Sequence, residues 1–393
     1  MASIFDNWIV QWKVFVDGED LTMAMRPVLT KITVSDKDGS ASDTCSLDFD
    51  DSLGQVKLPP EGASVKVFLQ GTQVFSGKVD SVRSNGSRGG GRTLSVGAKG
   101  FDAKGKAKEP QSHHMDDATL QDFLGKAAKN AGLESIVIDP AFAAVHRDYW
   151  SAAAESFLHL GQKIAREVGG TFKIRGDQAV LAKRGQGLSA TGQPMPTVVG
   201  RVGSGLEAGN VINWSISPVT GRGKFSKSKV RYFDRPSAKF KELEVETGVE
   251  ADATDEVRTT VADEDQAKTV AEGRKTETER EGGQGNVTLD LEVSAQAEGT
   301  FVLVGARPGI DGTYRISGVT HQADRSGGAT TSLDIKQPSE GAGKDKRKSG
   351  DGKSGAGDSS SGDAAAGSKP AAAATSNETY EGYNRRFGRT DEN

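Results

Sequence analysis

The sequence contains five histidines, which are frequent ligands of metal ions and frequent general bases. His113 and His114 are adjacent, so on an extended segment they would point to opposite sides. Asp116 and Asp117 follow closely, but no His or Cys follows at a spacing of three or four residues. A metal site is one interpretation of this cluster, and a segment that leads into a helix is the interpretation that we favour.

The other candidates for chemistry also lack partners in the sequence. His159 has Glu155 four residues before it and Lys163 four residues after it, which is typical of a solvated helix face. His146 has no nucleophile motif around it. Cys45, Leu47 and Phe49 alternate with polar neighbours, which is typical of strand residues that face a core. A single cysteine excludes an intrachain disulfide and a multi-cysteine zinc site, and no GxSxG, HExxH or Walker motif is present. The sequence therefore predicts no catalytic residue, no metal site and no cofactor.

His321 ends the stretch ARPGIDGTYRISGVTHQ, residues 306–322, which has the composition of a tight corner in a β-structure. No Ser, Cys or Asp arrangement nearby would make His321 a general base. The Asp-Gly pair at 311–312 favours a turn, and the break in alternation at 317–318 predicts a β-bulge. Since bulges help a sheet to curl, we expect a barrel corner whose inward face carries Tyr314, Ile316 and Val319.

Composition places these segments in a chain of 393 residues, long enough for two or three domains. Hydrophobic residues make up 35%, and the 50 glycines indicate many turns or an unfolded part. The net charge of −4 gives no basic field for nucleic acid. The first residues do not form a signal peptide, and no apolar run approaches the ~20 residues of a membrane-spanning helix, so we expect synthesis in a cytoplasm and no stable membrane insertion.

The pattern of turns and apolar residues divides the chain into four parts. Residues 1–105 read as short strands and predict a first small β-barrel domain, in which SNGSRGGGR (84–92) is a mobile loop rather than a nucleic-acid-binding RGG box. Residues 106–185 predict an α/β insertion of two helices and a hairpin. Its first helix would be capped by Asp116 or Asp117 and end at Gly132, and its second would stop at Gly169-Gly170.

Residues 186–337 return to β periodicity and predict a second β-barrel domain that includes one polar helix. The strand-turn-strand unit around Val79 and Val82 resembles the unit around Ile316 and Val319, which hints at two related barrels. The predicted fold class is therefore mainly β (α+β), with two small β-barrel domains, an inserted helix-containing α/β subdomain and a disordered C-terminal tail.

The tail, residues 338–393, has no Val, Ile, Leu, Met or aromatic residue before its last fourteen positions, so it cannot bury enough apolar area to fold. It ends in YEGYNRRFGRTDEN, where aromatic and Arg side chains of the kind that anchor interfaces return. This segment either docks on a neighbouring protein or is an end without a partner. The candidate partner-binding residues are Tyr380, Tyr383, Arg385, Arg386, Phe387 and Arg389.

Taken in order, these patterns resemble the late control gene D protein family, the baseplate hub proteins of contractile bacteriophage tails, which are related to the hub part of the type VI secretion VgrG spike. The resemblance is carried by DTCSLDFDD, LPPEGASVKVFL and FSGKVDSV in the first part, by the two predicted helices and the hairpin in the middle, and by DEDQAKTVAEGR and GIDGTYRISGVTHQ near the end. It covers roughly residues 10–337.

This resemblance implies a non-enzymatic structural protein of the virion, at the tail baseplate. It implies a homotrimer of six barrels that adapts a six-fold tail tube to a three-fold central spike. The ring would enclose a channel for the tape-measure protein or for DNA that passes without specific binding. Its partners would be the spike, the tube and other baseplate proteins. Two alternatives stay open at this point: a hub with a cell-wall-degrading role, and a soluble β-rich module that binds glycans or proteins.

Overall fold

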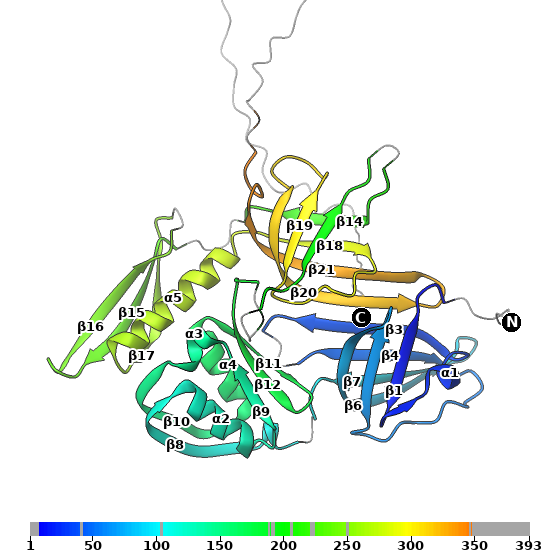
Figure 1. Cartoon of the computed structure of the whole chain (residues 1–393), viewed down its shortest axis with the longest axis horizontal. Helices are drawn as coiled ribbons and strands as arrows, with labels where there is room; N and C mark the ends of the chain where they lie inside the picture. The colour runs from blue at the N-terminus through cyan, green and yellow to red at the C-terminus, as the bar shows by residue number, and fades with distance from the viewer. Residues whose placement is uncertain are drawn as a thin grey trace, which may run out of the picture. The chain divides into compact units, whose positions relative to one another are not determined.

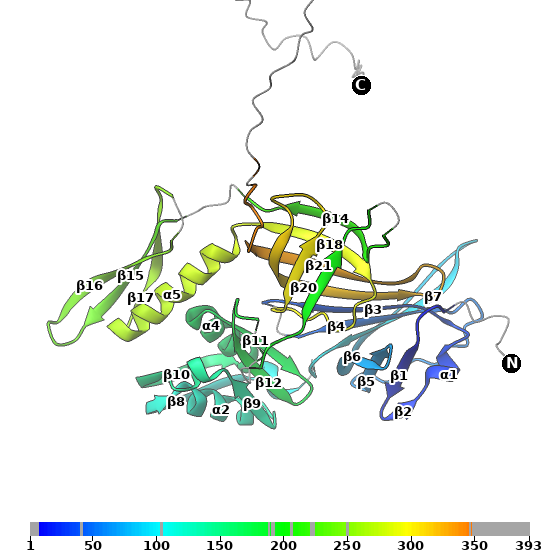
Figure 2. The ribbon, with the colours of Figure 1, turned by 45° about the horizontal axis from the view of Figure 1, so that its top comes forward.

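The computed structural model describes residues 8–39, 42–102, 105–187, 189, 193–204, 207–220, 225–248, 251–345 and 347. The described chain is mainly β, as predicted, and its largest sheet has 13 strands. Figures 1 and 2 show the strands in two views. The elements of the first β region are β1 (Trp12–Val16), β2 (Glu19–Asp20), α1 (Thr22–Met25), β3 (Leu29–Lys37), β4 (Thr44–Asp50), β5 (Ser64–Leu69), β6 (Thr72–Ser87) and β7 (Gly91–Lys99).

Alternation of apolar and polar residues places one face of each of these strands in a common core. In β4, for example, Cys45, Leu47 and Phe49 are buried and the residues between them are not. The prediction of a loop at residues 84–92 was wrong: β6 continues to Ser87 and β7 begins at Gly91, so the two strands form a long hairpin. The ends of these two strands were missed because glycine, which is frequent in this segment, has low β propensity.

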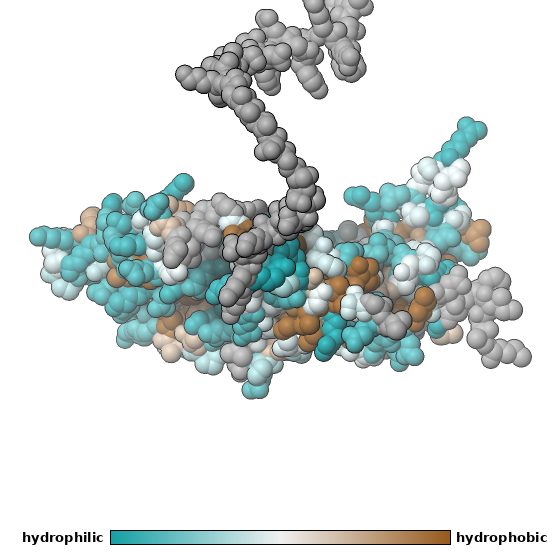
Figure 3. All heavy atoms as spheres, turned by 90° about the horizontal axis from the view of Figure 1, so that it is seen from above, coloured by the Kyte–Doolittle hydropathy of each residue, from teal (hydrophilic) through white to brown (hydrophobic). Residues whose placement is uncertain are grey.

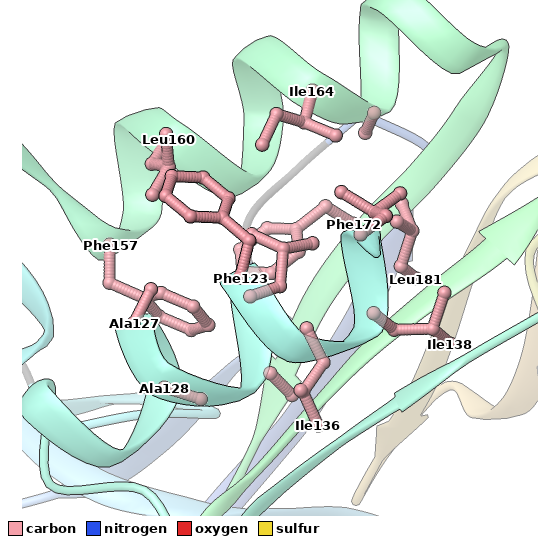
Figure 4. Close-up of a cluster of buried hydrophobic side chains, with 14 of the residues drawn as sticks. Phe123, Ala127, Ala128, Ile136, Ile138, Phe157, Leu160, Ile164, Phe172 and Leu181 are labelled. Carbon is pink, nitrogen blue, oxygen red and sulfur yellow. The ribbon is translucent and has the colours of Figure 1, made fainter. Parts of the chain in front are cut away.

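The insertion contains η1 (Lys106–Lys108), β8 (Pro110–Thr119), α2 (Leu120–Asn130), β9 (Ser135–Ile138), α3 (Pro140–Ala143), β10 (His146–Ser156), α4 (Phe157–Val168), β11 (Gly170–Arg175) and β12 (Gln178–Lys183). The predicted cap was wrong, because Asp116 and Asp117 lie in β8 and the side chain of Thr119 caps α2. Gly169 does end α4, in the left-handed conformation, as predicted. Both helices and β9, β11 and β12 enclose one apolar core, shown in Figure 4.

A small three-stranded sheet follows, with strand order β16-β15-β17. Its strands are β15 (Lys227–Asp234), β16 (Lys239–Glu246) and β17 (Thr254–Val261). The helix α5 (Glu264–Arg280) is the predicted polar helix, and it packs on this sheet through Ala267, Val270 and Ala271. We call residues 225–280 the arm; Figure 2 shows α5 lying along its strands.

The second β region consists of β13 (Thr197–Arg201), β14 (Val211–Ser217), β18 (Gln284–Asp290), β19 (Thr300–Val304), β20 (Gly312–Asp324) and β21 (Gly328–Ser339). Tyr314, Ile316 and Val319 are buried in its core, which confirms the predicted inward face. The β21 strand runs two residues past the predicted end at 337, and Ala342 is buried against the same core. Of the tail predicted to be disordered, residues 338–345 and 347 are described, and the rest lies outside the described residues.

The two β regions share one continuous sheet, because β20 pairs with β3 in antiparallel register from Gly318 opposite Lys37 to Asp324 opposite Lys31. Figure 1 shows β20 and β21 beside β3 and β4. The similarity between the two β regions extends to backbone detail. The register of β6 shifts between Val79 and Ser81, and that of β20 shifts between Ile316 and Gly318, which confirms the predicted bulge.

Candidate functional site

The histidines of the insertion are separated by the structure rather than gathered into a site. His113 lies against the ring of Phe123, with ring centroids 5.1 Å apart, and His114 stacks on Tyr149 from the opposite side of β8. Burial, followed by the charge of Lys126, lowers the pKa of His113. Nε2 of His146 lies 3.1 Å from Asp117 at the surface. Within the described ranges, no group of three or more His, Cys, Asp or Glu residues is arranged to hold a metal ion.

His159, His321 and Cys45 have the structural roles that their sequence contexts predict. His159 is exposed and lies 3.7 Å from Glu155 on the helix face. His321 is buried, its Nδ1 lies 3.0 Å from the hydroxyl of Thr331, and burial lowers its pKa to about 4. Cys45 lies in the first core, where burial raises the pKa of its thiol.

The candidate residues Tyr380, Tyr383, Arg385, Arg386, Phe387 and Arg389 lie outside the described residues. Among the helices that the structure describes, none is long and apolar enough to cross a membrane.

The most conspicuous polar feature is a buried charge network, which the sequence did not predict. Its cations are Lys173, Arg175, Arg184 and Arg280, which come from the insertion and from the end of α5. Its carboxylates are Asp36, Asp38, Asp43 and Glu298, which come from the two β regions. The network is therefore a junction of opposite charges, with every cation on the α/β side and every carboxylate on the sheet side.

Arg280 makes the most buried contacts of this network. Its Nη2 donates to Asp38 at 2.7 Å and its Nη1 donates to Glu298 at 2.9 Å, while only 4% of the arginine side chain is exposed. The hydroxyl of Thr171 donates to Asp38 at 2.9 Å, and Nε of Arg184 lies 3.6 Å from the same carboxylate. Hydrogen bonds to ionised partners are the strong ones in proteins, so Asp38 is held from three sides.

A second set of contacts attaches β11 to the ends of β3 and β4. Lys173 pairs with Asp36 and lies 3.4 Å from Asp43. Arg175 donates through Nε to Asp43 at 3.0 Å and through Nη2 to Asp36 at 3.3 Å. Together the two sets of contacts join four cations to four carboxylates, so the formal charges of the junction as a whole cancel.

Burial works against the individual charges of the network. Burial is the largest single influence on the pKa of Asp38 and would raise it. The nearby Arg184 and Arg280 together outweigh burial, so the pKa of this carboxyl is lowered. At Asp43 burial dominates over Arg175 and raises the pKa. Burial, reinforced by Arg175, also lowers the pKa of Lys173 to about 7. The Lys173–Asp43 contact is therefore the weaker ionic part of the junction, and the contact between Arg280 and Asp38 is the stronger.

A second feature is the outer face of the shared sheet, opposite the two cores. Along the middle of this face, outward side chains are small and uncharged: Ser35 lies opposite Thr320, which lies opposite Ser332, which lies opposite Thr288. On the other side of Ser35, Thr33 pairs with Ser46 on β4. We call this surface the hydroxyl face; its members are Thr33, Ser35, Thr44, Ser46, Ser81, Ser95, Asn213, Ser215, Asn286, Thr288, Thr320, Gln322, Thr330 and Ser332.

The sheet that carries this face has open edges at both ends of an eight-strand run, β14-β18-β21-β20-β3-β4-β7-β6. At one end, β14 pairs only with β18 among the described residues. At the other end, β5 stops pairing with β6 at Lys78, so the part of β6 after Asp80 pairs only with β7 in the same set of residues. Strand β14 has no charged residue and no proline, and Ile212 (51%) and Trp214 (40%) are exposed on it. Figure 3 shows a few hydrophobic patches on an otherwise largely hydrophilic surface.

Comparisons with known proteins show which proteins this chain is similar to. Residues of this chain align with the "Probable baseplate hub protein" of Escherichia phage 186 at 25% identity over 357 residues, 81% of this chain and 91% of that protein. The "Probable baseplate hub protein" of Escherichia phage P2 is 26% identical over 193 residues, 48% of this chain, and the match spans about half the length of the P2 protein. No protein-family model matches the chain.

Solved structures of phage tail proteins have the same fold. A tail protein from Neisseria meningitidis MC58 superposes with a TM-score of 0.64 at 16% identity, covering 83% of this chain and 96% of that one. The 43 kDa tail protein of prophage MuSo2 from Shewanella oneidensis gives 0.60 at 13% identity, with 83% and 98% covered. The E. coli c3393 protein, a type VI secretion component, gives 0.52 at 12% identity, with 84% and 78% covered.

The resemblance to baseplate hub proteins seen in the sequence is thus confirmed, and the comparisons support a hub role in a phage tail baseplate. The junction residues were missed because each reads as an ordinary charged residue in its own segment. Two signals could have found them: Asp36 continues the inward alternation of Ile32 and Val34, and Lys173 lies within a strand whose other central residues are buried.

Proposed function

We propose that this chain is the non-enzymatic hub of a phage tail baseplate, and that three copies form a ring around a channel. The observation that carries the proposal is the eight-strand run, which joins two similar β regions edge to edge through β20 and β3 and leaves an edge open at each end. If each copy repeats this junction with the next, β14 of one copy meets β6 of its neighbour. Three copies then close into a ring with six β regions.

The character of β14 supports this closure. Open edge strands are normally protected by charges, proline or bulges, because unpaired backbone groups recruit other strands. The β14 strand has one register shift, near Ile212, but its sequence VINWSIS carries neither a charge nor a proline. An unprotected edge with exposed apolar side chains favours a strand of a second copy as its partner.

The same closure would turn the hydroxyl face toward the channel, because both cores lie on the other side of the sheet. Uncharged hydroxyl and amide groups do not hold phosphates as Lys and Arg do, so DNA or a tape-measure protein could pass without stable binding. The ring would adapt a six-fold tail tube to a three-fold spike, with the tube, the spike and other baseplate proteins as partners. The chain would be made in the host cytoplasm and then become part of the virion.

Light scattering on the full chain at several concentrations tests the trimer. We expect a mass of three chains, and we expect Ile212→Lys to shift the mass toward one chain because it places a charge on the open edge. Phe240→Lys is the matched control: Phe240 is 66% exposed, but it lies on β16, outside the shared sheet. A single-chain mass at every concentration would overturn self-assembly and favour the β-rich binding module, which glycan-binding assays would then address.

The lining of the channel has a test of its own. We expect no binding of fluorescent double-stranded DNA by the full chain at ~0.1 M salt, and measurable, salt-sensitive binding by Thr320→Lys/Ser332→Lys, which adds two cations to the hydroxyl face. Strong binding by the unmodified chain would contradict passage without binding. Clearing of a cell-wall suspension by the purified chain would contradict the non-enzymatic role.

The terminal segment is proposed to dock on a neighbouring tail protein through Tyr380, Tyr383, Arg385, Arg386, Phe387 and Arg389. Aromatic and Arg side chains dominate binding energies at interfaces, which supports the choice of these residues. Deletion of residues 376–393 should reduce particle assembly or infectivity. Unchanged assembly and infectivity would show that the segment has no essential partner.

A further inference from the structure

The charge network divides the described chain into two bodies with separate cores. The α/β body contains the insertion and the arm, whose buried apolar residues form two clusters of their own. The sheet body contains the two β regions, whose cores are formed by β-strands and the segments between them. No buried apolar residue of the insertion or the arm belongs to a core of the sheet body in the described part of the chain.

Within the α/β body, the insertion and the arm are tied to each other directly. Glu167 on α4 accepts from Nε2 of Gln266 on α5 at 2.6 Å, and Arg235 on the arm donates to Asp148 on β10 at 2.7 Å. The backbones of α4 and α5 also meet at Gly169 and Gly273, where a Cβ added to Gly169 would lie 3.0 Å from the other Cα. These contacts bring the four cations of the network onto one body.

Cavities flank the network on both sides, so the junction is held by charge more than by close packing. A cavity of about 230 Å³ is lined by Thr171, Lys173 and Glu298 among others. A second cavity of about 310 Å³ is lined by Asp36, Asp43 and His321, and Arg175 lines both. Both cavities open to the surface, so solvent reaches the edges of the junction, as it does at the polar rim of an interface between two proteins.

We propose that the α/β body is a movable module that is docked on the sheet body by this complementary ionic junction and can separate from it while both bodies stay folded. The segregation of the ion pairs supports this directly, because four cations of the α/β body face four carboxylates of the sheet body. Arg315 of β20 also reaches the junction, where it donates to the backbone carbonyl of Gly185 at 2.9 Å. Interfaces between domains that are polar and modest in size permit relative motion, whereas continuous apolar cores do not. The inference does not depend on the hub role, since it concerns the single chain.

Two backbone amides report the state of the junction. The N–H of Gly185 donates to Oε2 of Glu298 at 3.0 Å, which is a hydrogen bond from one body to the other. The N–H of Gly176, in the turn between β11 and β12, donates to the carbonyl of Gly100, at the end of the first β region, at 2.7 Å. Both bonds break if the bodies separate, whereas the ladder between β11 and β12 does not.

Hydrogen–deuterium exchange of the full chain, resolved by peptide, tests the proposal. The variant Lys173→Met/Arg175→Met removes two of the four cations, and Arg175→Met alone is the milder form, since this side chain is half exposed. We expect exchange at Gly176 and Gly185 to rise by roughly tenfold in the double variant, with α2, α4, β3 and β20 still protected. Lys229→Met is the matched control, because Lys229 pairs with Glu244 at 2.7 Å on the arm's exposed face.

Each other outcome overturns the proposal. Unchanged exchange at Gly176 and Gly185 would show that charge does not hold the junction. Simultaneous loss of protection in α2, α4, β3 and β20 would show that the two bodies unfold as one. If the double variant fails to fold, the same criteria apply to Arg175→Met, where a smaller rise confined to the two reporter amides supports the proposal and no rise contradicts it.

Discussion

Replacement of Arg280 by methionine should destabilise the protein strongly at neutral pH. The arginine is almost fully buried and bridges Asp38 and Glu298, which are themselves 13% and 7% exposed. Methionine keeps much of the length and the apolar stem but removes the charge and the donors. Two buried carboxylates would then lose their strongest partner.

The size of this loss in stability depends on the partners that each carboxylate still has after the substitution. Asp38 retains the more distant Arg184, Glu298 retains the N–H of Gly185, and the two carboxylates share the one hydroxyl proton of Thr171. Breaking a buried ion pair by removing one partner costs about 3–5 kcal/mol, because the remaining charge is left uncompensated. We expect a loss in this range in the free energy of unfolding, which is a large share of the 5–15 kcal/mol typical of a folded protein.

The sign of the pH dependence gives a second check. In the unmodified protein the pKa of Asp38 is lowered, so its contribution is present above its ordinary value near 3.8 and is lost as the pH falls through the folded pKa. In the variant the orphaned carboxylates bind protons more readily in the folded state. The difference between the two proteins should therefore shrink as the pH falls from 7 toward 4.

Urea unfolding followed by tryptophan fluorescence, at one fixed protomer concentration, measures this difference. The control is Arg231→Met, which removes an exposed pair with Glu242 at 3.0 Å and should cost less than about 1 kcal/mol. A loss below about 1 kcal/mol for Arg280→Met, or a deficit that grows as the pH falls, would refute the view that Arg280 compensates two buried charges.

Two further predictions concern single buried positions. Burial lowers the pKa of His321 to about 4, so between pH 6.5 and 4 the unfolded chain binds a proton that the folded chain does not bind. The free energy of unfolding should therefore fall by about 3 kcal/mol over this pH range. His321→Gln should flatten this dependence in urea titrations. Gly161→Ala should lower the melting temperature, at a cost of about 1–3 kcal/mol, because a Cβ there would lie 2.5 Å from the ring of Phe172. At Gly125 a Cβ meets nothing within 4 Å, so Gly125→Ala should raise the melting temperature, through a gain of up to about 1 kcal/mol in helix propensity. Equal shifts in melting temperature for both glycines would contradict the packing argument.

The elements of the fold could be predicted where a local pattern decides them. The helical stripe of α4, the bulge in β20 and the turn between β11 and β12 depend on residues that are neighbours in sequence. The strands β8 and β10 were missed because their pairing, from His146 opposite Thr119 to Ser156 opposite Pro110, joins segments without clear alternation. A two-stranded ribbon of polar residues leaves little period-2 signal in either strand.

The junction could not be predicted because its contacts span long distances in sequence. Arg280 and Asp38 are 242 residues apart, and Arg175 and Asp43 are 132 apart. In the sequence each of these residues is one charged residue among 104, and nothing local distinguishes a buried ion from a solvated one. Only the tertiary arrangement shows that the chain collects cations on one body and carboxylates on the other.

Adjacent residues of a single strand serve two different surfaces of this protein. In β3, Ser35 points outward to the hydroxyl face and approaches the hydroxyl of Thr320 to 3.2 Å, while Asp36 points to the junction and pairs with Lys173. Alternation along the strand makes this possible, and it also makes the pairing register with β20 critical. A slip of one residue would turn Asp36 toward the hydroxyl face and bury Ser35 against the α/β body. The bulge at Ile316–Gly318 lies where β20 begins to pair with β3, so the same backbone feature that curls the sheet also keeps the two surfaces apart.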